Sequence, residues 1–382
     1  MSRQKSDALV FFGASGDLAY KQIFPALAAM VRRDDLRVPI IGVAKSEWSL
    51  DDLKKRAKES LDQHGEVDDS VFEKLCSLLR YVDGDYNDPK TFEQLHGELG
   101  AARSPLYYLA IPPELFATVA EGLARSENIK NARVVVEKPF GRDLKSARQL
   151  NSILHKYFKE ENIFRIDHYL GKEPVQNLIY FRFANPSVHA AWSRDYIESV
   201  QITMAEKIGL EGRGKLYDEE GAIRDVVQNH MLEVVACLAM ECPESANHEA
   251  IRDKRNQLLR EIKPLTAADV VRGQFAGYRN EKNVRGDSQI ETFAALRFQI
   301  ENDRWRGVPF YVRAGKCLPV SCTEVMVRFK LPAHPVLDEN ENRTNCYYRL
   351  RLSPEVVLAQ GVKVKRPGEL MVGEPIELIA HF

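Results

Sequence analysis

The stretch "ALVFFGASGDLAYKQIFPAL", Ala8 to Leu27, decides the fold of the first part of the chain. Its apolar start predicts a buried strand, and residues 21–33 predict a helix. Between them lies a glycine turn with the spacing G-x-x-G rather than the full G-x-G-x-x-G. A strand, a tight turn and a helix N-terminus together can hold a pyrophosphate on free N–H groups, although a plain strand-to-helix turn has the same outline. The candidate cofactor contacts here are Gly13, Ser15, Gly16, Asp17 and Leu18.

Strand and helix patterns alternate outward from this turn. Further apolar strands are predicted at 38–45, 79–85, 105–113, 132–141 and 163–170, and helices at 49–61 and 143–158. Ser49 is a plausible N-cap of the first of these helices. Because the strands are continuously apolar and alternate with helices, we expect a Rossmann-like, doubly wound parallel sheet over residues 1–165.

The pattern changes after about residue 175. Segments at 200–208, 293–302, 309–316, 324–331, 347–354 and 374–382 alternate apolar and polar side chains, which is typical of antiparallel strands with one covered face. Two helices are predicted among them, at 222–240 and 245–262. We therefore expect an α+β domain over residues 166–382, built on a large and mostly antiparallel sheet.

The composition excludes several classes of partner. The 382 residues contain 54 Lys and Arg against 55 Asp and Glu, a net charge of −1, so no global field attracts nucleic acid or an anionic membrane. No secretory signal begins the chain, and no run of about 18 apolar residues predicts a membrane span. The six cysteines lack the spacing of a metal site, so we expect no metal, reduced thiols and a cytoplasmic location.

The end of the second predicted strand, "GVAKSEW", indicates which dinucleotide binds. NAD-binding folds often carry an acid there, which accepts from the ribose 2′-OH. Here Lys45 and Ser46 occupy that place, and a lysine attracts a 2′-phosphate. The pattern favours NADP over NAD, with a solvated lysine as the alternative.

Two further motifs carry candidate chemistry. In "VVVEKPFG", Lys138 and Pro139 follow a buried strand at the edge where such sheets bind ligands, so Lys138 is a candidate to orient a substrate hydroxyl. In "FRIDHYLGKEP", Asp167 and His168 are neighbours in a predicted strand. Successive strand side chains point to opposite faces, so these two are not expected to form a pair with each other.

A second histidine lies in the predicted helix 222–240. Asp225, Gln228, Asn229 and His230 interrupt an otherwise apolar stretch. Polar groups are costly at such a position unless they are paired or functional. A hydrogen-bonded core histidine is the alternative to a functional one.

These motifs resemble one family. "GASGDLA", "VEKPFG", "RIDHYLGKE", "EGRGKLYDEEGAIRDVVQNH" and "PFYVRAGKCLP" occur in the order found in glucose-6-phosphate dehydrogenases, and they span nearly the whole chain. The resemblance implies oxidation of the C1 hydroxyl of β-D-glucose 6-phosphate to 6-phosphoglucono-1,5-lactone with reduction of NADP, the first step of the pentose phosphate pathway. It also implies a homodimer or homotetramer.

The resemblance further assigns roles to residues. His230 is implied as the general base and Asp167 as the group that bonds its far ring nitrogen. Lys138 is implied to bridge substrate and cofactor, and Pro139 to pack near the nicotinamide. The remaining substrate contacts that it implies are His168, Tyr169 and Lys172 for the phosphate, and Glu206, Asp225 and Lys316 for the sugar.

The chain departs from the family pattern in places. Tyr20 and Gln22 stand where many members carry basic residues, which predicts a lower affinity for substrate or cofactor unless other groups supply it. Ser321 stands where many members carry a further basic residue, so we expect no second, structural NADP site. The final strand runs into the terminus at "GEPIELIAHF", so we expect the second domain to be truncated. Two other functions remain open: a sugar or inositol dehydrogenase that shares the "EKP" motif, and a non-catalytic NADP-binding subunit.

Overall fold

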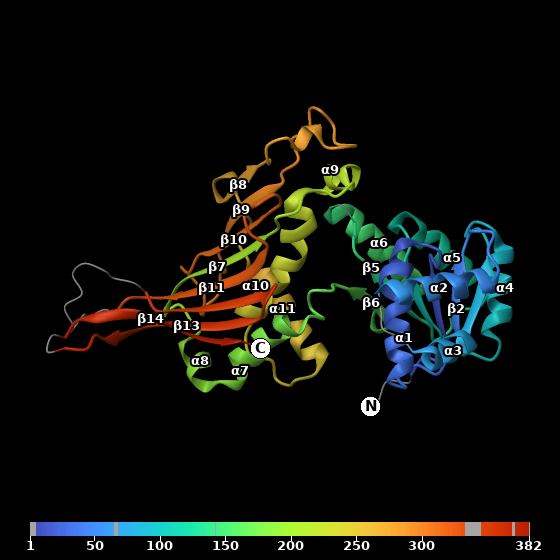
Figure 1. Ribbon diagram of the computed structural model, residues 1–382, viewed down its shortest axis with the longest axis horizontal. Helices are drawn as coiled ribbons and strands as arrows, with labels where there is room; N and C mark the ends of the chain where they lie inside the picture. Colours follow the sequence, from blue (N-terminus) through green and yellow to red (C-terminus); the bar gives the residue numbers. More distant parts are fainter. Residues whose placement is uncertain (1–4, 65–67, 142, 333–344, 369–370, 382) are drawn as a thin grey trace. The chain divides into compact units, whose positions relative to one another are not determined.

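The chain divides into two compact units, Met1–Ile166 and Asp167–Phe382. The computed structural model describes residues 5–64, 68–141, 143–332, 345–368 and 371–381, and each unit is described here by itself. The first runs from blue to green in Figure 1, and the second from green to red.

The first unit is built on a six-stranded sheet in which every neighbouring pair is parallel. The strand order is β3-β2-β1-β4-β5-β6, which confirms the predicted doubly wound sheet. Its strands are β1 (Leu9–Phe12), β2 (Ile40–Ala44), β3 (Leu79–Asp83), β4 (Leu106–Leu109), β5 (Arg133–Glu137) and β6 (Ile163–Ile166). Buried side chains at every position of β2 show that both faces of the central sheet are covered.

Helices complete the first unit. They are η1 (Ala19–Ile23), which is a π-helix, and α1 (Phe24–Arg32), α2 (Leu50–His64), α3 (Asp69–Leu78), α4 (Pro89–Leu99), α5 (Phe116–Arg125) and α6 (Leu144–Tyr157). Short 3₁₀ turns lie at η2 (Pro113–Leu115) and η3 (Glu160–Asn162). The N-cap predicted at Ser49 is confirmed, because its hydroxyl accepts from Asp52 N at 3.2 Å.

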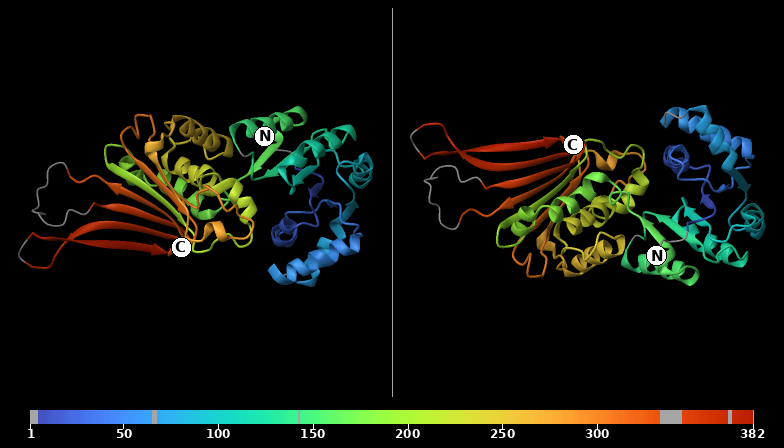
Figure 2. Two further views of the ribbon diagram at one scale, coloured as in Figure 1. Left: turned by 90° about the horizontal axis from the view of Figure 1, so that it is seen from above. Right: turned by 90° about the horizontal axis from the view of Figure 1, so that it is seen from below.

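The second unit is built on a large, mostly antiparallel sheet, as predicted, and this sheet has eight strands. Its order is β14-β13-β12-β11-β7-β10-β9-β8; only β7 and β10 pair in parallel among these described strands. The strands are β7 (Ile197–Ala205), β8 (Val270–Gly273), β9 (Phe293–Phe298), β10 (Phe310–Gly315), β11 (Cys322–Phe329), β12 (Tyr347–Ser353), β13 (Val357–Lys365) and β14 (Gly373–His381). Strands β11 to β14 extend side by side in both views of Figure 2.

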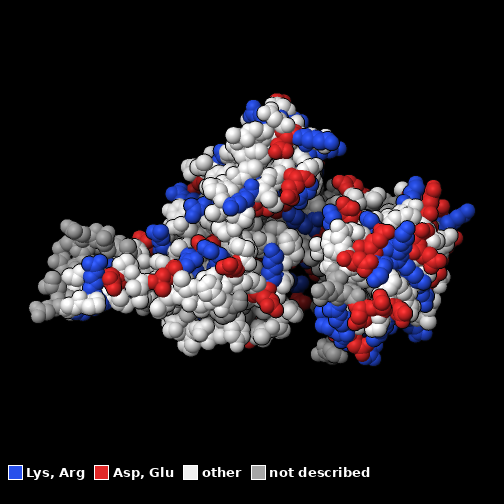
Figure 3. All heavy atoms as spheres, in the orientation of Figure 1, with Lys and Arg blue, Asp and Glu red and all other residues white. Residues whose placement is uncertain are grey.

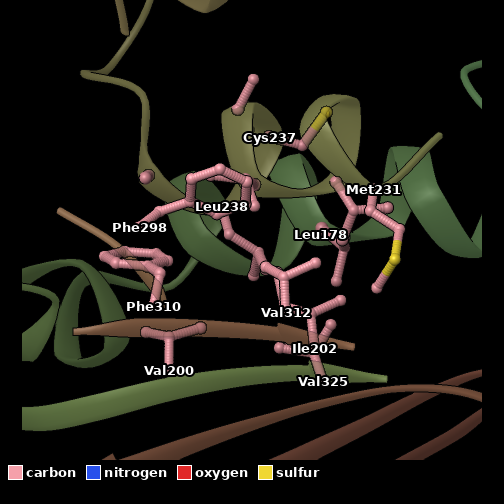
Figure 4. Packing of buried hydrophobic residues seen from close by; sticks show 14 of the residues in the cluster. Leu178, Val200, Ile202, Met231, Cys237, Leu238, Phe298, Phe310, Val312 and Val325 are labelled. Atoms are coloured by element: carbon pink, nitrogen blue, oxygen red, sulfur yellow. The ribbon is translucent and has the colours of Figure 1, made fainter. Parts of the chain in front are cut away.

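Helices pack on one face of this sheet and enclose the core. They are α7 (Glu173–Ala184), α8 (Pro186–Ala191), α9 (Gly214–Ala222), η4 (Ile223–Met231), α10 (Leu232–Ala239) and α11 (His248–Glu261), with 3₁₀ turns η5 (Ala267–Asp269) and η6 (Tyr278–Asn280). Figure 4 shows Leu178, Met231 and Leu238 from the helices above Ile202, Val312 and Val325 from the strands.

One prediction of local structure was wrong. Asp167 and His168 do not continue a strand, because β6 ends at Ile166 and the chain turns there. The predicted helix 222–240 is confirmed, and its first half, η4, is a π-helix. A π-helix is rare and occurs mainly at functional sites, and apolar periodicity does not distinguish it from an α-helix.

The surface carries both signs of charge. On the face drawn in Figure 3, Lys and Arg alternate with Asp and Glu over the first unit, in keeping with the net charge of −1. Among the described residues, no helix is both long enough and apolar enough to cross a bilayer.

Strand β10 provides a test of the second core. Phe310 is fully buried and lies edge-on to Trp305, whereas Tyr311 is 45% exposed on the other face. We expect Phe310→Ala to lower the free energy of unfolding by about 3–5 kcal/mol, through lost burial and the cavity left behind. Tyr311→Ala should cost less than about 1 kcal/mol. Urea unfolding followed by tryptophan fluorescence measures both; equal losses would contradict the assigned faces.

Candidate functional site

The glycine turn of the first unit follows β1. Gly13 has φ +83°, and a Cβ added there would overlap the carbonyl oxygen of Ala110, so this position requires glycine. Gly16 and Asp17 are exposed, and the helix begins at residue 17. The turn lies where β1 and β4 neighbour each other, the point at which doubly wound sheets bind their ligands. It therefore has the close backbone approach and the helix N-terminus that a pyrophosphate needs.

Residues from the end of β2 meet this turn. The hydroxyls of Ser46 and Ser15 are 2.6 Å apart, and Ser46 N donates to Asp83 at 3.0 Å. Lys45 is exposed, and its ammonium group donates to Asp85 at 2.8 Å. This hydrogen bond raises the pKa of Lys45 and lowers that of Asp85 to about 2, so both groups are charged at neutral pH. Sequence reasoning missed Asp85, since nothing in the spacing pairs it with Lys45.

Lys138 and Pro139 follow β5 directly, and a cis peptide bond joins them. Since all six strands are parallel, both residues lie at the same edge of the sheet as the glycine turn. Both side chains are half-buried. The structure therefore brings together, within the first unit, the candidates that the sequence places at strand ends.

The second unit brings Asp167 and His230 together across 63 residues of sequence, with His230 Nδ1 2.9 Å from Asp167 Oδ1. An ionised carboxylate only accepts, so Nδ1 carries the proton and donates. Burial alone would raise the pKa of Asp167, but the hydrogen bond and charge of His230 and the N–H of Tyr169 outweigh it and lower the pKa. The imidazole is held in one tautomer, with Nε2 as its basic nitrogen.

Aromatic rings pack around this pair. The ring of Tyr169 stacks on His230 with centroids 4.4 Å apart, and the His168 ring lies 4.4 Å from His230 on a tilted plane. The ammonium of Lys172 is 4.2 Å from the Tyr169 ring centre. The Tyr169 hydroxyl lies 3.3 Å from Thr323 Oγ1, inside the core. His168 is exposed, so a ligand can reach the edge of the stack that carries it.

An ion pair between a buried lysine and a half-buried glutamate lies at the ends of β7 and β10. Lys316 is 5% exposed, and its ammonium donates to Glu206 Oε2 at 2.6 Å. The ring of Tyr217 lies 5.5 Å from the same ammonium. Burial raises the pKa of Tyr217, and the charges of Asp225 and Glu206 add to this, so the phenol is neutral. Sequence reasoning missed Tyr217, although it lies inside the motif that contains His230.

Asp225 and His230 both belong to η4, which runs into α10. Val226, Val227 and Met231 are the buried residues that anchor η4 in the core. Asp225 stands in the first turn and is half-buried. The wide π-turns place these polar residues on a helix whose other side is core, which supports a functional rather than a merely structural histidine.

One group among the described residues has the donors of a metal site. Asp167, His168 and His230 each offer one ligand atom, all within 4.8 Å of one another. Asp167 and His230 already form a hydrogen bond with each other. The absence of a metal stays a prediction.

Two family models match the chain almost end to end. The model described as "Glucose-6-phosphate dehydrogenase, NAD binding domain" matches residues 10–177. The model described as "Glucose-6-phosphate dehydrogenase, C-terminal domain" matches residues 179–382. Together they cover both units.

Individual proteins give the same result. Glucose-6-phosphate 1-dehydrogenase 1 of Mycobacterium bovis is 45% identical over 351 residues, which are 92% of this chain and 75% of that protein. The crystal structure of glucose-6-phosphate 1-dehydrogenase from Mycobacterium avium is 43% identical, with a TM-score of 0.91 over 99% of this chain and 83% of that one. A glucose-6-phosphate dehydrogenase in complex with its substrate glucose-6-phosphate is 36% identical, with a TM-score of 0.91 over 100% and 83%.

The Asp167–His230 pair predicts a pH-dependent loss of stability. Asp167→Ala leaves a buried N–H of His230 without its acceptor, so we expect the free energy of unfolding to fall by about 1–3 kcal/mol at neutral pH. Asp167→Asn keeps an acceptor oxygen, so its free energy of unfolding should fall by less. Folding lowers the pKa of Asp167, so the ionised carboxylate stabilises the folded state. This stabilisation is fully present above the pKa that Asp167 has in the unfolded chain, and it is lost as the pH falls through the lower pKa of the folded state.

The difference in free energy of unfolding between wild type and Asp167→Ala should therefore become smaller at acidic pH. Urea unfolding over a pH series, followed by the fluorescence of Trp192 and Trp305 in the second unit, measures it. A gap that stays constant down to strongly acidic pH would contradict this account of the pair.

Proposed function

The chain belongs to the glucose-6-phosphate dehydrogenase family and has that family's oxidoreductase activity in the pentose phosphate pathway, and we propose which of its residues perform the reaction. The observation that carries the proposal is the 2.9 Å contact between Asp167 and buried His230. Around it lie the cationic groups that an anionic sugar needs in a chain of net charge −1.

We propose that His230 is the general base. Its Nε2 removes the proton of the C1 hydroxyl while the C1 hydride leaves, so that the C1–O bond becomes the lactone carbonyl. Asp167 holds the Nδ1 proton and stabilises the imidazolium that forms. NADP, when bound, supplies the acceptor for the hydride.

Cationic and acidic side chains bind the sugar phosphate in this proposal. His168 and Lys172 hold the phosphate, since one is exposed and the other carries its charge over the Tyr169 ring. Tyr169 joins them only if its hydroxyl leaves Thr323. The paired Lys316 and Glu206, with Asp225, hold the sugar hydroxyls.

The first unit is a nucleotide-binding domain, and we propose NADP as its cofactor. Its contacts are Gly13, Ser15, Gly16, Asp17, Leu18, Lys45 and Ser46, with Lys138 and Pro139 near the nicotinamide. Support comes from Gly13, where a side chain would block the backbone's close approach, and from the charge on Lys45. Asp85 already neutralises part of that charge, so the preference over NAD is one of degree.

We also propose an assembly state and a cellular location. Exposed apolar side chains on β14, at Ile376, Leu378 and Ile379, support a homodimer or homotetramer. The six cysteines are unpaired, which supports a reducing, cytoplasmic location.

We expect His230→Asn to abolish turnover while binding of glucose 6-phosphate stays largely intact. The amide keeps a similar size but cannot accept the proton, so kcat should fall by at least about 10²–10⁴-fold. NADPH formation measured by absorbance gives kcat, and calorimetry gives sugar-phosphate binding. Wild-type enzyme run with glucose in place of glucose 6-phosphate is the control for the phosphate. Retained turnover in the variant would refute the assignment of the base.

Cofactor choice is tested at the end of β2. We expect Lys45→Ala to reduce the ratio of kcat/KM for NADP over NAD by roughly 5- to 10-fold, the effect of one exposed charged contact to the 2′-phosphate. Asp85→Asn should change the ratio in the opposite direction, because it releases the whole charge of Lys45. If the ratio is unchanged in Lys45→Ala, another group selects the cofactor.

A further inference from the structure

A buried acid outside the proposed catalytic set lies at the start of the helix that carries His230. Glu291 is 5% exposed and stands two residues before β9. Its side-chain oxygen Oε1 accepts from Ile223 N at 3.0 Å, and its backbone oxygen accepts from Ala222 N at 3.0 Å. Both donors are at the N-terminal end of η4, where backbone N–H groups lack partners inside the helix. Glu291 therefore caps η4 from the segment that precedes β9, 68 residues further along the chain.

The chain bends sharply at this cap. Gly221, near the end of α9, has φ 72° and ψ 174°, a non-helical conformation that other residues rarely adopt. A Cβ on Gly221 would lie 2.7 Å from Glu291 Oε1. The glycine thus leaves room for the carboxyl group, and the carboxyl group in turn holds the first residues of the new helix.

Thr292, the residue next to Glu291, contacts Lys316 on the other side of the site. Thr292 is fully buried, and its carbonyl oxygen accepts from Lys316 N at 3.0 Å. Its own N–H and hydroxyl bond Gly273 O and Phe275 N at 2.9 and 2.8 Å, which fixes the segment in place. Two adjacent residues therefore join the helix of His230 to the lysine that pairs with Glu206.

We infer that Glu291 is a positioning residue for the reaction: by capping η4 it sets where Asp225 and His230 stand relative to Lys316 and Glu206. The inference rests on the proposed roles of those residues. His230 is seven positions along the same helix from the capped N–H of Ile223, so a shift at the cap moves the base as a unit with its helix. A displacement of about 1 Å at a reacting group can reduce the rate by about 100-fold.

The test compares two replacements of Glu291 in the full chain. We expect Glu291→Ala to lower kcat by roughly 10- to 100-fold, with a smaller rise in KM for glucose 6-phosphate. The KM for NADP should not change, because its proposed contacts lie in the first unit. Glu291→Gln keeps an oxygen that can accept from Ile223 N, so it should restore kcat to within about fivefold of wild type. Asp287→Ala, at an exposed acid four residues earlier, is the matched control and should behave as wild type.

A double-variant cycle tests the contact itself. Gly221→Ala should lower kcat strongly, because the new methyl meets Glu291 and the backbone is strained. In the Glu291→Ala background, Gly221→Ala should reduce kcat by a smaller factor, since the carboxyl group that the methyl would meet is absent. If Gly221→Ala does not fold, the alanine and glutamine variants of Glu291 still decide the question.

The outcomes separate this inference from the proposed function. An inactive wild-type chain would refute the proposed function. If wild type is active, the inference is overturned when Glu291→Ala keeps kcat within about twofold while its thermal midpoint falls, since that is a purely structural role. It is also overturned when Glu291→Gln is as impaired as Glu291→Ala, or when the effects of Gly221→Ala and Glu291→Ala multiply fully.

Discussion

The hydrogen bond between Asp167 and His230 is the interaction on which the geometry of the second unit's site depends. It connects a turn after the last strand of the parallel sheet to a helix of the antiparallel domain, 63 residues later. The imidazole is buried, so its Nδ1 proton must have a partner, and the carboxylate is kept ionised by that same contact. The hydrogen bond between them therefore offsets the cost of burying both polar groups. The stack of Tyr169 and His168 on the ring then limits its orientation.

Cationic contacts at the candidate sites come from local charge pairs rather than from the net charge of the chain. Lys45 with Asp85 and Lys316 with Glu206 are cation–anion pairs at the two candidate binding sites. In each pair a carboxylate accepts from the lysine ammonium, and a bound phosphate or hydroxyl can share the lysine. In the proposed function, these two pairs supply the local cationic contacts that a net charge of −1 does not provide.

The regular elements were predictable because their signals are local. Ser49 starts α2 through its own hydroxyl, and the continuous apolar run of β2 indicates a strand covered on both faces. The turn at Asp167 and the π-helix were not predictable in this way. Apolar spacing is the same for a π-turn inside an amphipathic helix, and the end of β6 depends on its pairing with β5. Asp85, Tyr217 and Glu291 were missed because each acts through a partner distant in sequence.

The sequence by itself determined the two-part organisation, the glycine turn and, through ordered motifs, the family and its candidate residues. Periodicity and turn chemistry act over a few residues, so they can be read from the chain alone. The resemblance already implied the contact of Asp167 with His230, which the structure shows at 2.9 Å. Only the tertiary structure decided that Tyr169 turns its hydroxyl into the core and that Glu291 caps the helix of His230. These contacts join segments tens of residues apart, and their geometry depends on how strands and helices pack around a buried core.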